Sequence, residues 1–431
     1  MRIDFERRTL RNGLRVVLSP DRSLPVVAVN LWYRVGSRNE EPGRTGFAHL
    51  FEHMMFQGSE HVPDTQHIAH IERMGGSMNG STWLDRTNYF ETVPSHFLER
   101  VLWLESDRMG FFLPALTQQK FDTQREVVKN ERRWRVDNQP YGDWDERLQA
   151  LVYPDDHPYH HSVIGSMGDL DAATLDDVRR FFRTHYSPNN AVLTICGDFE
   201  TADAERLVEH YFGGIPRGED PPPLPGESDL SPTLDGEVVE EVRGDVALPR
   251  IYLAYRIPPF GTDGYLAADL ASRILASGKA SRLYARLVRD RSIVQDVGAF
   301  AFPIVTGAAM LVVRATVSPH ASVEEVQAEL DRQMVELRGQ GPTPEEKERA
   351  LSGVESGNLL GLQKVGTRAD QLSMYTALFD DPDLLNRELD SYRGVTGEDI
   401  RHLADGRLRP EHRVRLVYHP KAADPARKEA A

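Results

Sequence analysis

Two stretches of the chain have the hydrophobic pattern of buried strands, and each opens one half of the sequence. They read SLPVVAVNLWYRVGS at residues 23–37 and VALPRIYLAYRIPPF at residues 246–260, and both are rich in Val, Ile and Tyr. Such runs, bounded by polar and turn residues, predict strands of a sheet. A segment with helical periodicity follows each strand, at residues 45–59 and 264–281. Both helical segments end in a glycine-containing stop.

A charged helical segment recurs later in each half. It covers residues 118–134 in the first half and residues 344–360 in the second. The same succession of strand, helix and charged helix therefore occurs twice, which indicates an internal duplication. We predict an α+β fold with two homologous α+β domains, each an antiparallel-type sheet packed with helices. The alternative is a chance similarity between two α/β patterns.

The segment between the two halves has a different composition. It reads GGIPRGEDPPPLPGESDLSPTLD from residue 213, is dense in Pro, Gly and acidic residues, and lacks helical or strand periodicity. This composition predicts a semi-rigid linker. We place the linker at residues 215–235, between an N-terminal domain at 1–214 and a C-terminal domain at 236–431.

Composition narrows the class of protein. The 431 residues include 51 Lys and Arg against 66 Asp and Glu, a net charge of −15, which argues against a nucleic-acid partner because phosphates would be repelled. No stretch approaches the roughly 20 apolar residues of a membrane-spanning helix. The N-terminus mixes charges and has no secretory pattern, so we expect a cytoplasmic protein, with export of a trimmed form as the alternative. The single cysteine, Cys196, excludes an intrachain disulfide and is predicted to be a buried strand thiol.

The candidate chemistry lies in the helical segment of the first half, which contains His49-Leu50-Phe51-Glu52-His53. Positions i and i+4 lie about 40° apart around a helix, so both imidazoles can share one metal ion. Glu52 stands next to His53 and can act as general base on a metal-activated water instead of binding the metal. The order HxxEH is the reverse of the HExxH motif. The alternative is a chance grouping on a solvated helical face.

A catalytic zinc ion takes three protein ligands and keeps one position open, so two histidines leave one ligand to be found. The charged segment at 118–134 offers Glu126 and Glu131. These two residues point to different faces of a helix, so only one is expected to point inward. Glu131 shares an edge with the apolar residues Val127 and Val128, whereas Glu126 is expected to be a solvated surface acid.

The residues after the motif helix predict an exposed edge strand. The stretch GGSMNGST at residues 75–82 is short, small and polar, which suits an edge better than a core strand. An extended peptide can add to such an edge through main-chain hydrogen bonds. Asn79 and Gly80 are the candidate substrate contacts. The alternative is an edge strand that is merely protected.

The remaining histidines carry less weight. His157, His160 and His161 lie in HPYHH, which follows a turn and lacks an i, i+4 pair, so a loop-packing role is favoured over a surface metal. His67 and His70 are predicted to be surface residues of a helix.

The chain resembles the pitrilysin or M16 family of metallopeptidases over nearly its full length. The resemblance is carried by the inverted motif at His49, by VVKNERR around Glu131, and by GGSMNGSTWLDRTNYFETVP, HPYHHSVIG, YSPNNAVLTICGDF and GKASRLYARLVRD, which begin at residues 75, 157, 186 and 278. It implies Zn²⁺ as cofactor, Glu131 as the third ligand, and an edge strand that holds substrate beside the zinc. It also implies that the first domain is catalytic, that the second is not, and that the chain forms half of a clamshell-shaped chamber.

The sequence departs from the family pattern at Gln124. Several members carry a glutamate seven residues before the zinc glutamate, where it supports a metal-bound histidine. Gln124 can still accept a hydrogen bond there, although the basicity of the histidine would be reduced.

The resemblance also implies a second subunit. Single-chain members have four similar domains, and this chain has about two. In relatives an arginine and a tyrosine of the far half bind the substrate backbone. The matching stretch here is residues 297–315, and its loop contains neither an arginine nor a tyrosine. A partner of M16 type would supply them, so a heterodimer is favoured over a homodimer. Arg368 and Tyr375, seven residues apart on one helical face, are expected to be structural.

The function that follows is a zinc-dependent endopeptidase acting on peptides or unfolded precursor segments, as the catalytic subunit of a dimer. Two alternatives stay open. One is a non-peptidase zinc hydrolase. The other is a non-catalytic subunit of an M16-type assembly or processing complex, which would have no physical need for His49, Glu52, His53 and Glu131 together.

Overall fold

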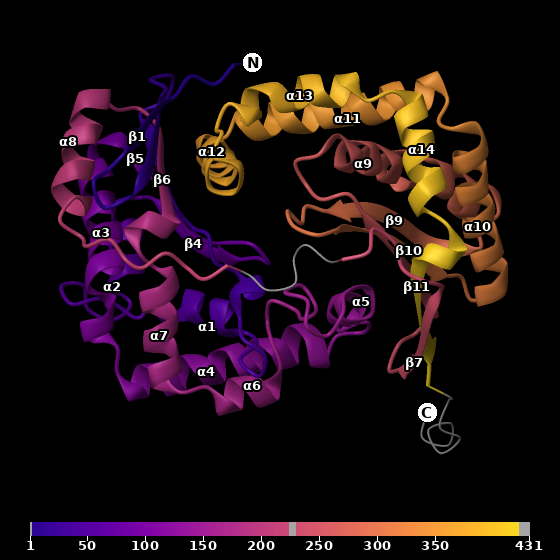
Figure 1. Cartoon of the computed structure of the whole chain (residues 1–431), viewed down its shortest axis with the longest axis horizontal. Coiled ribbons are helices and arrows are strands. Elements are labelled where there is room, and N and C mark those ends of the chain that lie inside the picture. The colour runs from indigo at the N-terminus through magenta and orange to yellow at the C-terminus, as the bar shows by residue number, and fades with distance from the viewer. Residues whose placement is uncertain (1, 224–229, 422–431) are drawn as a thin grey trace. The chain divides into compact units, whose positions relative to one another are not determined.

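The Val- and Ile-rich runs of the sequence form the central strands of two separate sheets. The structure, a computed structural model, describes residues 2–223 and 230–421 (Figure 1). The chain divides into two units. Unit 1 comprises the described residues of Met1–Arg132, His161–Pro225 and Ser356–Glu388, and unit 2 those of Arg133–His160, Gly226–Glu355 and Leu389–Ala431.

Unit 1 contains a six-stranded sheet in the order β1-β2-β6-β3-β5-β4. β2 and β6 run parallel, and the other neighbouring strands are antiparallel. Among the described residues β4 pairs with β5 alone, so β4 is an edge strand, as the sequence predicted. The strands are β1 Glu6–Thr9, β2 Arg15–Pro20, β3 Val26–Tyr33, β4 Ser77–Thr82, β5 Thr87–Pro94 and β6 Ala191–Gly197.

The side chains of β3 alternate between the two faces of this sheet. Val29 and Leu31 belong to the hydrophobic core. Asn30 and Trp32 point to the other face, where both donate hydrogen bonds to Asp370 of α12. The helices of unit 1 are α1 Phe47–Met54, α2 Gln66–Arg73, α3 Leu98–Ala115, α4 Gln118–Arg132, α6 Met167–Ala172, α7 Leu175–His185, α8 Thr201–Phe212 and α12 Val365–Phe379, with short 3-10 turns at Ser37–Asn39, Ser95–Phe97 and Pro188–Asn190.

Unit 2 contains a five-stranded sheet in the order β7-β11-β8-β10-β9. Its strands are β7 Val238–Gly244, β8 Arg250–Ile257, β9 Val294–Phe302, β10 Ala309–Val317 and β11 Arg413–Pro420. Its helices are α5 Trp144–Val152, α9 Asp263–Ala276, α10 Val323–Gln340 and α14 Gly397–Arg407, with π-helical turns at Arg133–Asp137 and Tyr284–Asp290 and a 3-10 turn at Pro410–His412. α11 Pro344–Leu362 and α13 Leu384–Gly394 contribute residues to both units.

The two sheets share one topology. β2, β6, β3, β5 and β4 correspond in order to β7, β11, β8, β10 and β9, and only the first pair of each series, β2–β6 and β7–β11, is parallel. α1 follows β3 along the chain, and α9 follows β8, the strand that corresponds to β3. The predicted duplication of an α+β unit is thereby confirmed.

Each unit also contains a helix from the other half of the sequence. α12, from the second half, packs on β3 and β6 of unit 1, and α5, from the first half, packs on β8 and β11 of unit 2. The predicted domains at 1–214 and 236–431 do not include this exchange. In the predicted linker, 215–223 and 230–235 contain no helix or strand, and 224–229 lie outside the described residues.

Three further predictions can be compared with the structure. Cys196 is fully buried in β6, as expected. None of the described helices combines the length and apolar character needed to cross a bilayer. The connection between β9 and β10 contains Pro303, Ile304 and Val305, which is the loop that lacks an Arg and Tyr pair.

Candidate metal centre and substrate edge

Contacts at its N-terminus and on its core side fix where helix α1 starts and which of its faces points to the core. It begins after Gly46, whose φ of +86° lies in the left-handed region. The Glu40 carboxylate accepts hydrogen bonds from the backbone N–H groups of Gly46 and Ala48, both at 2.8 Å. On the core side the Phe51 ring lies 4.1 Å from the Tyr186 ring, centroid to centroid. A carboxylate at a helix N-terminus stabilises the otherwise unpaired N–H groups, so α1 presents one defined face to solvent.

That face carries the two histidines of the motif, and both approach one carboxylate. The ring centroids of His49 and His53 lie 4.8 Å apart. Glu131 Oε2, on α4, lies 3.2 Å from His53 Nε2 and 3.8 Å from His49 Nε2. One ligand atom from each of the three side chains lies within 4.8 Å of the other two. The structure therefore brings together the three predicted ligand residues from two helices.

The donor set and its spacing fit a zinc ion. Two ligands about 2.1 Å from a tetrahedral ion lie roughly 3.4 Å apart, and the two His–Glu131 distances of 3.2 and 3.8 Å are close to that. Two imidazoles and one carboxylate are a known catalytic zinc set, which leaves a fourth position open. The side chains of His49, His53 and Glu131 are 12%, 23% and 17% exposed, so solvent can reach the centre.

The other predicted residues of α4 lie around this centre. Glu126 is exposed and accepts a hydrogen bond of 2.9 Å from Lys129 Nζ, so it is a surface acid, as expected. Gln124 is half-buried, seven residues before Glu131, which places the two about two turns apart on one side of the helix. The support of a metal-bound histidine by Gln124 stays a prediction.

The side chain of Glu52, on α1, extends toward the edge strand β4. Its Oε2 accepts a hydrogen bond of 2.6 Å from Thr82 Oγ1. Burial raises the pKa of the Glu52 carboxyl, and the Thr82 hydroxyl and the neighbouring His53 oppose this rise only in part. A carboxyl that is half-buried, held by one hydroxyl and next to the candidate metal ligands has the position of a general base.

The edge strand approaches Glu52 closely at Gly80. A Cβ placed on Gly80 would lie 3.1 Å from Glu52 Cγ and 3.1 Å from the Phe56 ring, so a larger residue here would displace one of these side chains. Asn79 is exposed, and its Oδ1 accepts the backbone N–H of Gly80 at 2.9 Å. Both candidate substrate residues therefore lie on the edge strand, and Gly80 lies directly beside Glu52.

Sequence reasoning missed Glu40, which holds the start of α1. His161 Nε2 lies 3.0 Å from Glu40 Oε2, and burial raises the pKa of the Glu40 carboxyl. In the same HPYHH stretch His157 is buried and His160 Nδ1 contacts a backbone carbonyl oxygen at 2.9 Å. The loop-packing interpretation therefore agrees with the structure. An acidic residue shortly before a helix start is the signal that could have identified Glu40.

The prediction of a surface position is wrong for His67. His67 is 2% exposed, and its Nε2 lies 3.3 Å from Glu105 Oε1. His70 is half-buried. His67, Glu91 and Glu105 form a second group of ligand atoms, but Arg108 Nη2 lies 2.5 Å from Glu105 and its positive charge disfavours a metal there. The prediction failed because the acids that bury His67 come from β5 and α3, distant in sequence.

Comparisons with known proteins agree with this geometry. Residues 15–155 match the family model described as insulinase (peptidase family M16), and residues 172–354 match the one described as the peptidase M16 inactive domain. A Helicobacter pylori protein named zinc protease PqqE is 35% identical over 68% of this chain and 65% of that protein, less than two thirds of its length. A Mycobacterium leprae protein described as a zinc protease is 26% identical over 92% of this chain and 88% of that protein.

Solved structures show the same fold. The crystal structure of a protease from Helicobacter pylori superposes with a TM-score of 0.90 at 27% identity, and covers 97% of this chain and 100% of that chain. A structure described as the peptidase M16 inactive domain from Pseudomonas fluorescens has a TM-score of 0.84 at 19% identity, with 98% and 99% coverage, and shows likeness of fold alone.

Proposed function

Because the chain belongs to peptidase family M16, whose relatives include proteins named zinc proteases, we propose that it is itself a catalytically active zinc endopeptidase. The observation that carries this proposal is the convergence of His49, His53 and Glu131, with the Glu52 carboxylate on the same helix beside them. The substrates proposed are peptides or unfolded precursor segments. We further propose that the chain acts in an enclosed chamber completed by a second M16-type subunit.

In the proposed reaction the chain holds the ion and moves one proton. When bound, zinc supplies the Lewis acidity that activates water and polarises a peptide carbonyl. Glu52 takes the proton of the attacking water and returns it to the leaving nitrogen, so that OH adds to the carbonyl carbon and H to the amine as the C–N bond breaks. Burial supports this double role, because a raised pKa brings Glu52 closer to the pH at which it must both accept and donate.

The peptide would bind as an added strand beside β4. Main-chain hydrogen bonds to an edge strand hold any sequence in extended form, which suits a peptidase with many substrates. The Gly80 N–H now donates to the Asn79 side chain at 2.9 Å, and a substrate carbonyl could replace that acceptor. The small residue at Gly80 keeps the bound peptide close to Glu52.

Two alternative functions, an assembly subunit and a non-peptidase zinc hydrolase, each make one structural feature of the site unnecessary. A non-catalytic M16-type assembly subunit would not depend on all four residues at the centre, yet all four are present with metal-binding spacing. A non-peptidase zinc hydrolase would use the same centre without needing an open strand edge at β4.

The test is digestion of a peptide library by the purified protein, read by mass spectrometry. The proposal expects internal cleavage that stops when a chelator removes the metal and returns with stoichiometric Zn²⁺. Zinc binding without cleavage of any peptide, alone or with a related subunit present, would contradict the proposed peptidase and favour the assembly subunit. Hydrolysis of non-peptide esters alone would favour the zinc hydrolase.

A further inference from the structure

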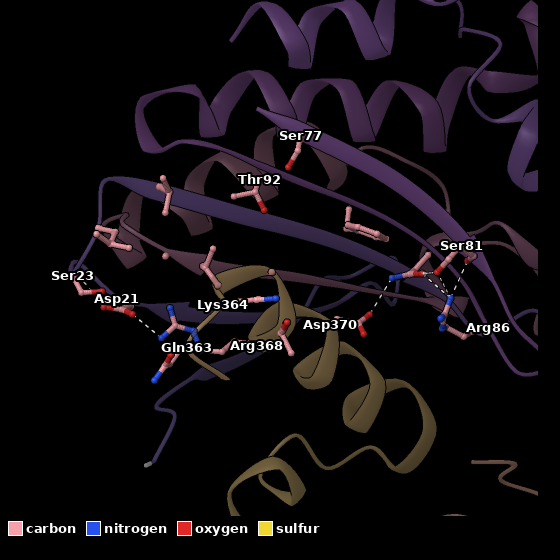
Figure 2. A pocket seen from close by; sticks show the side chains of 18 residues that line it. Asp21, Ser23, Ser77, Ser81, Arg86, Thr92, Gln363, Lys364, Arg368 and Asp370 are labelled. Atoms are coloured by element: carbon pink, nitrogen blue, oxygen red, sulfur yellow. Dashed lines mark hydrogen bonds and ion pairs between the residues drawn. The ribbon is translucent and has the colours of Figure 1, made fainter. Parts of the chain in front are cut away.

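A groove of about 630 Å³ lies in unit 1, on the face of the sheet that packs against α12 (Figure 2). β3, β4 and β5 supply its floor, and residues of the first turns of α12, with Gln363 and Lys364 before them, supply the opposite wall. Ser77 and Ser81 extend the lining to the edge strand β4. The groove is therefore open to the strand edge where the proposed substrate binds.

The alternation of β4 relates this groove to the metal centre. Gly80 and Thr82 face Glu52 on one side of the sheet, whereas Ser77 and Ser81 line the groove on the other side. A peptide paired with β4 alternates in the same way, since successive side chains of a strand point to opposite faces. Every second side chain of the peptide would then lie over the groove, at a spacing of about 6.6 Å.

Three cations and two carboxylates line the groove, so its positive charges exceed its negative charges by one. Arg368 Nη1 pairs with Asp21 Oδ2 at 2.7 Å, and Asp370 Oδ1 accepts hydrogen bonds from β3 and β5. Arg86 Nη1 donates to the backbone and side chains of the β4–β5 hairpin. Lys364 is exposed on the wall, and among the described residues no carboxylate forms an ion pair with it (Figure 2).

The surroundings of Lys364 favour a carboxylate as well. Lys364 stands at the N-cap position of α12, a helix of 15 residues with no side-chain cap, and the N-terminal end of a helix is its positive end. Val26, Phe90 and Val365 add apolar surface to the lining. A side chain with methylene groups and a terminal carboxylate would contact both the apolar surface and the ammonium group.

We propose that this groove is a specificity subsite that selects glutamate or aspartate at alternate positions of a peptide bound along β4, with Lys364 as the selecting residue. The inference rests on the proposed peptidase function and adds the substrate preference of that site. The chain has a net charge of −15, and an acidic protein ordinarily repels acidic peptides. A measured preference for acidic peptides would therefore point to a local positive site such as Lys364.

The experiment uses the full chain, together with its partner subunit if one is required, and peptides that differ only by Glu, Gln or Lys at one position at a time. The wild type should cleave the Glu peptide fastest at two positions separated by one residue. In Lys364→Glu the Glu-to-Lys rate ratio should fall by about five- to thirtyfold, because an attraction becomes a repulsion. Lys364→Gln should abolish the preference without reversing it. Arg11→Glu makes the same charge change in the turn between β1 and β2, at the opposite edge of the sheet, and should keep the wild-type ratio.

A binding arm separates this inference from the peptidase itself. Fluorescence anisotropy of the same peptides with Glu52→Gln reads binding without turnover. If nothing is cleaved but Glu peptides bind more tightly and Lys364→Glu reverses that order, the groove is supported while the peptidase proposal fails. The inference is overturned by an unchanged ratio in Lys364→Glu, by an equal shift in Arg11→Glu, by a preference at adjacent positions, or by no peptide binding at all.

Discussion

Two carboxylates near the candidate metal centre differ in their contacts, and this difference supports the different roles proposed for them. Glu131 points its Oε2 at both histidines, 3.2 and 3.8 Å from their Nε2 atoms. Glu52, on the same helix as the histidines, instead accepts a hydrogen bond from the Thr82 hydroxyl, and burial raises its pKa. One acid is therefore placed to bind a cation and the other to exchange a proton.

We expect Glu131→Gln to lose most of its bound zinc and Glu126→Gln to keep it. The amide removes the negative charge that a cation needs from its third ligand, and the expected loss of affinity is at least about tenfold to a hundredfold. Glu126→Gln is the matched control, since it makes the same change on α4 at an exposed position paired with Lys129. Zinc per chain after dialysis against a weak chelator measures both. Equal retention in the two variants would remove Glu131 as a ligand.

At the scale of single residues, the sequence predicts the position of a side chain well where the spacing of residues along one helix determines the face on which it lies. His49 and His53 share a face because they are four residues apart. Glu131 was separated from Glu126 by its spacing from Val127 and Val128, of which Val128 is buried as expected and Val127 is 41% exposed. His67 was misplaced, and Glu40 was missed, because their partners come from other segments of the chain. No local spacing indicates which acid a histidine will meet after folding.

At the scale of elements, α7 supports the metal-site helix from the core side. The rings of Phe181 and Phe182, on α7, lie 6.1 and 5.7 Å from the Phe51 ring on α1. His185 ends α7 and is 5% exposed. Burial lowers the pKa of His185 to about 4, although a position near a helix C-terminus ordinarily favours the charged imidazole. Desolvation therefore outweighs the helix dipole.

This burial predicts a loss of stability in acid. The unfolded chain protonates His185 below about pH 6.5, whereas the folded chain resists protonation down to about pH 4. The unfolded state therefore binds more protons between these values, and the free energy of unfolding falls as the pH is lowered. From pH 7 to pH 5 this one group should remove about 2 kcal/mol.

Urea unfolding of the metal-free protein at pH 7 and pH 5 measures the effect. His185→Gln should lose less stability between the two pH values than the wild type, by that same amount, whatever its own stability at pH 7. His96→Gln, at an exposed histidine, is the control and should follow the wild type. An identical pH dependence in His185→Gln and the wild type would contradict a neutral buried imidazole.

Strand patterns predicted elements well where side chains are buried on both sides. β3 and β8 lie within the two Val- and Ile-rich runs identified in the sequence. β4 was recognised for the opposite reason, because its small polar residues suit an edge. The role of α12 could not be inferred, since its contacts with β3 and β6 are made with strands more than a hundred residues earlier in the chain.

At the scale of the whole molecule, the duplication was visible in the sequence but the exchange of helices was not. The repeated order of strands follows from a repeated hydrophobic pattern, and both sheets have it. α5 and α12 pack in the unit opposite to their half of the sequence, and composition gives no sign of that. A Pro-rich segment marks where the chain lacks regular structure, not where packing contacts divide.

We expect the active form to be a dimer with a related but different M16 chain. The connection after β9 contains Pro303, Ile304 and Val305 in place of the Arg and Tyr pair that the family resemblance leads one to expect. A partner with that pair would restore the substrate-binding set. Sizing with light scattering should give a species of about twice 48.7 kDa when this chain is mixed with a paralogue encoded nearby, and a rise in peptidase rate. Full activity from the chain alone, unchanged by the paralogue, would contradict the heterodimer, and a dimer of identical chains would favour the runner-up.

The central claim is that Glu52 performs the proton transfer at a zinc centre held by His49, His53 and Glu131. Zinc content and peptide cleavage rate, measured side by side on Glu52→Gln and wild type, test it most directly. The amide leaves the three ligand residues intact but cannot take a proton, so the variant should retain its zinc and lose at least about a hundredfold in rate. A Glu52→Gln variant that holds zinc and cleaves at the wild-type rate would contradict the account.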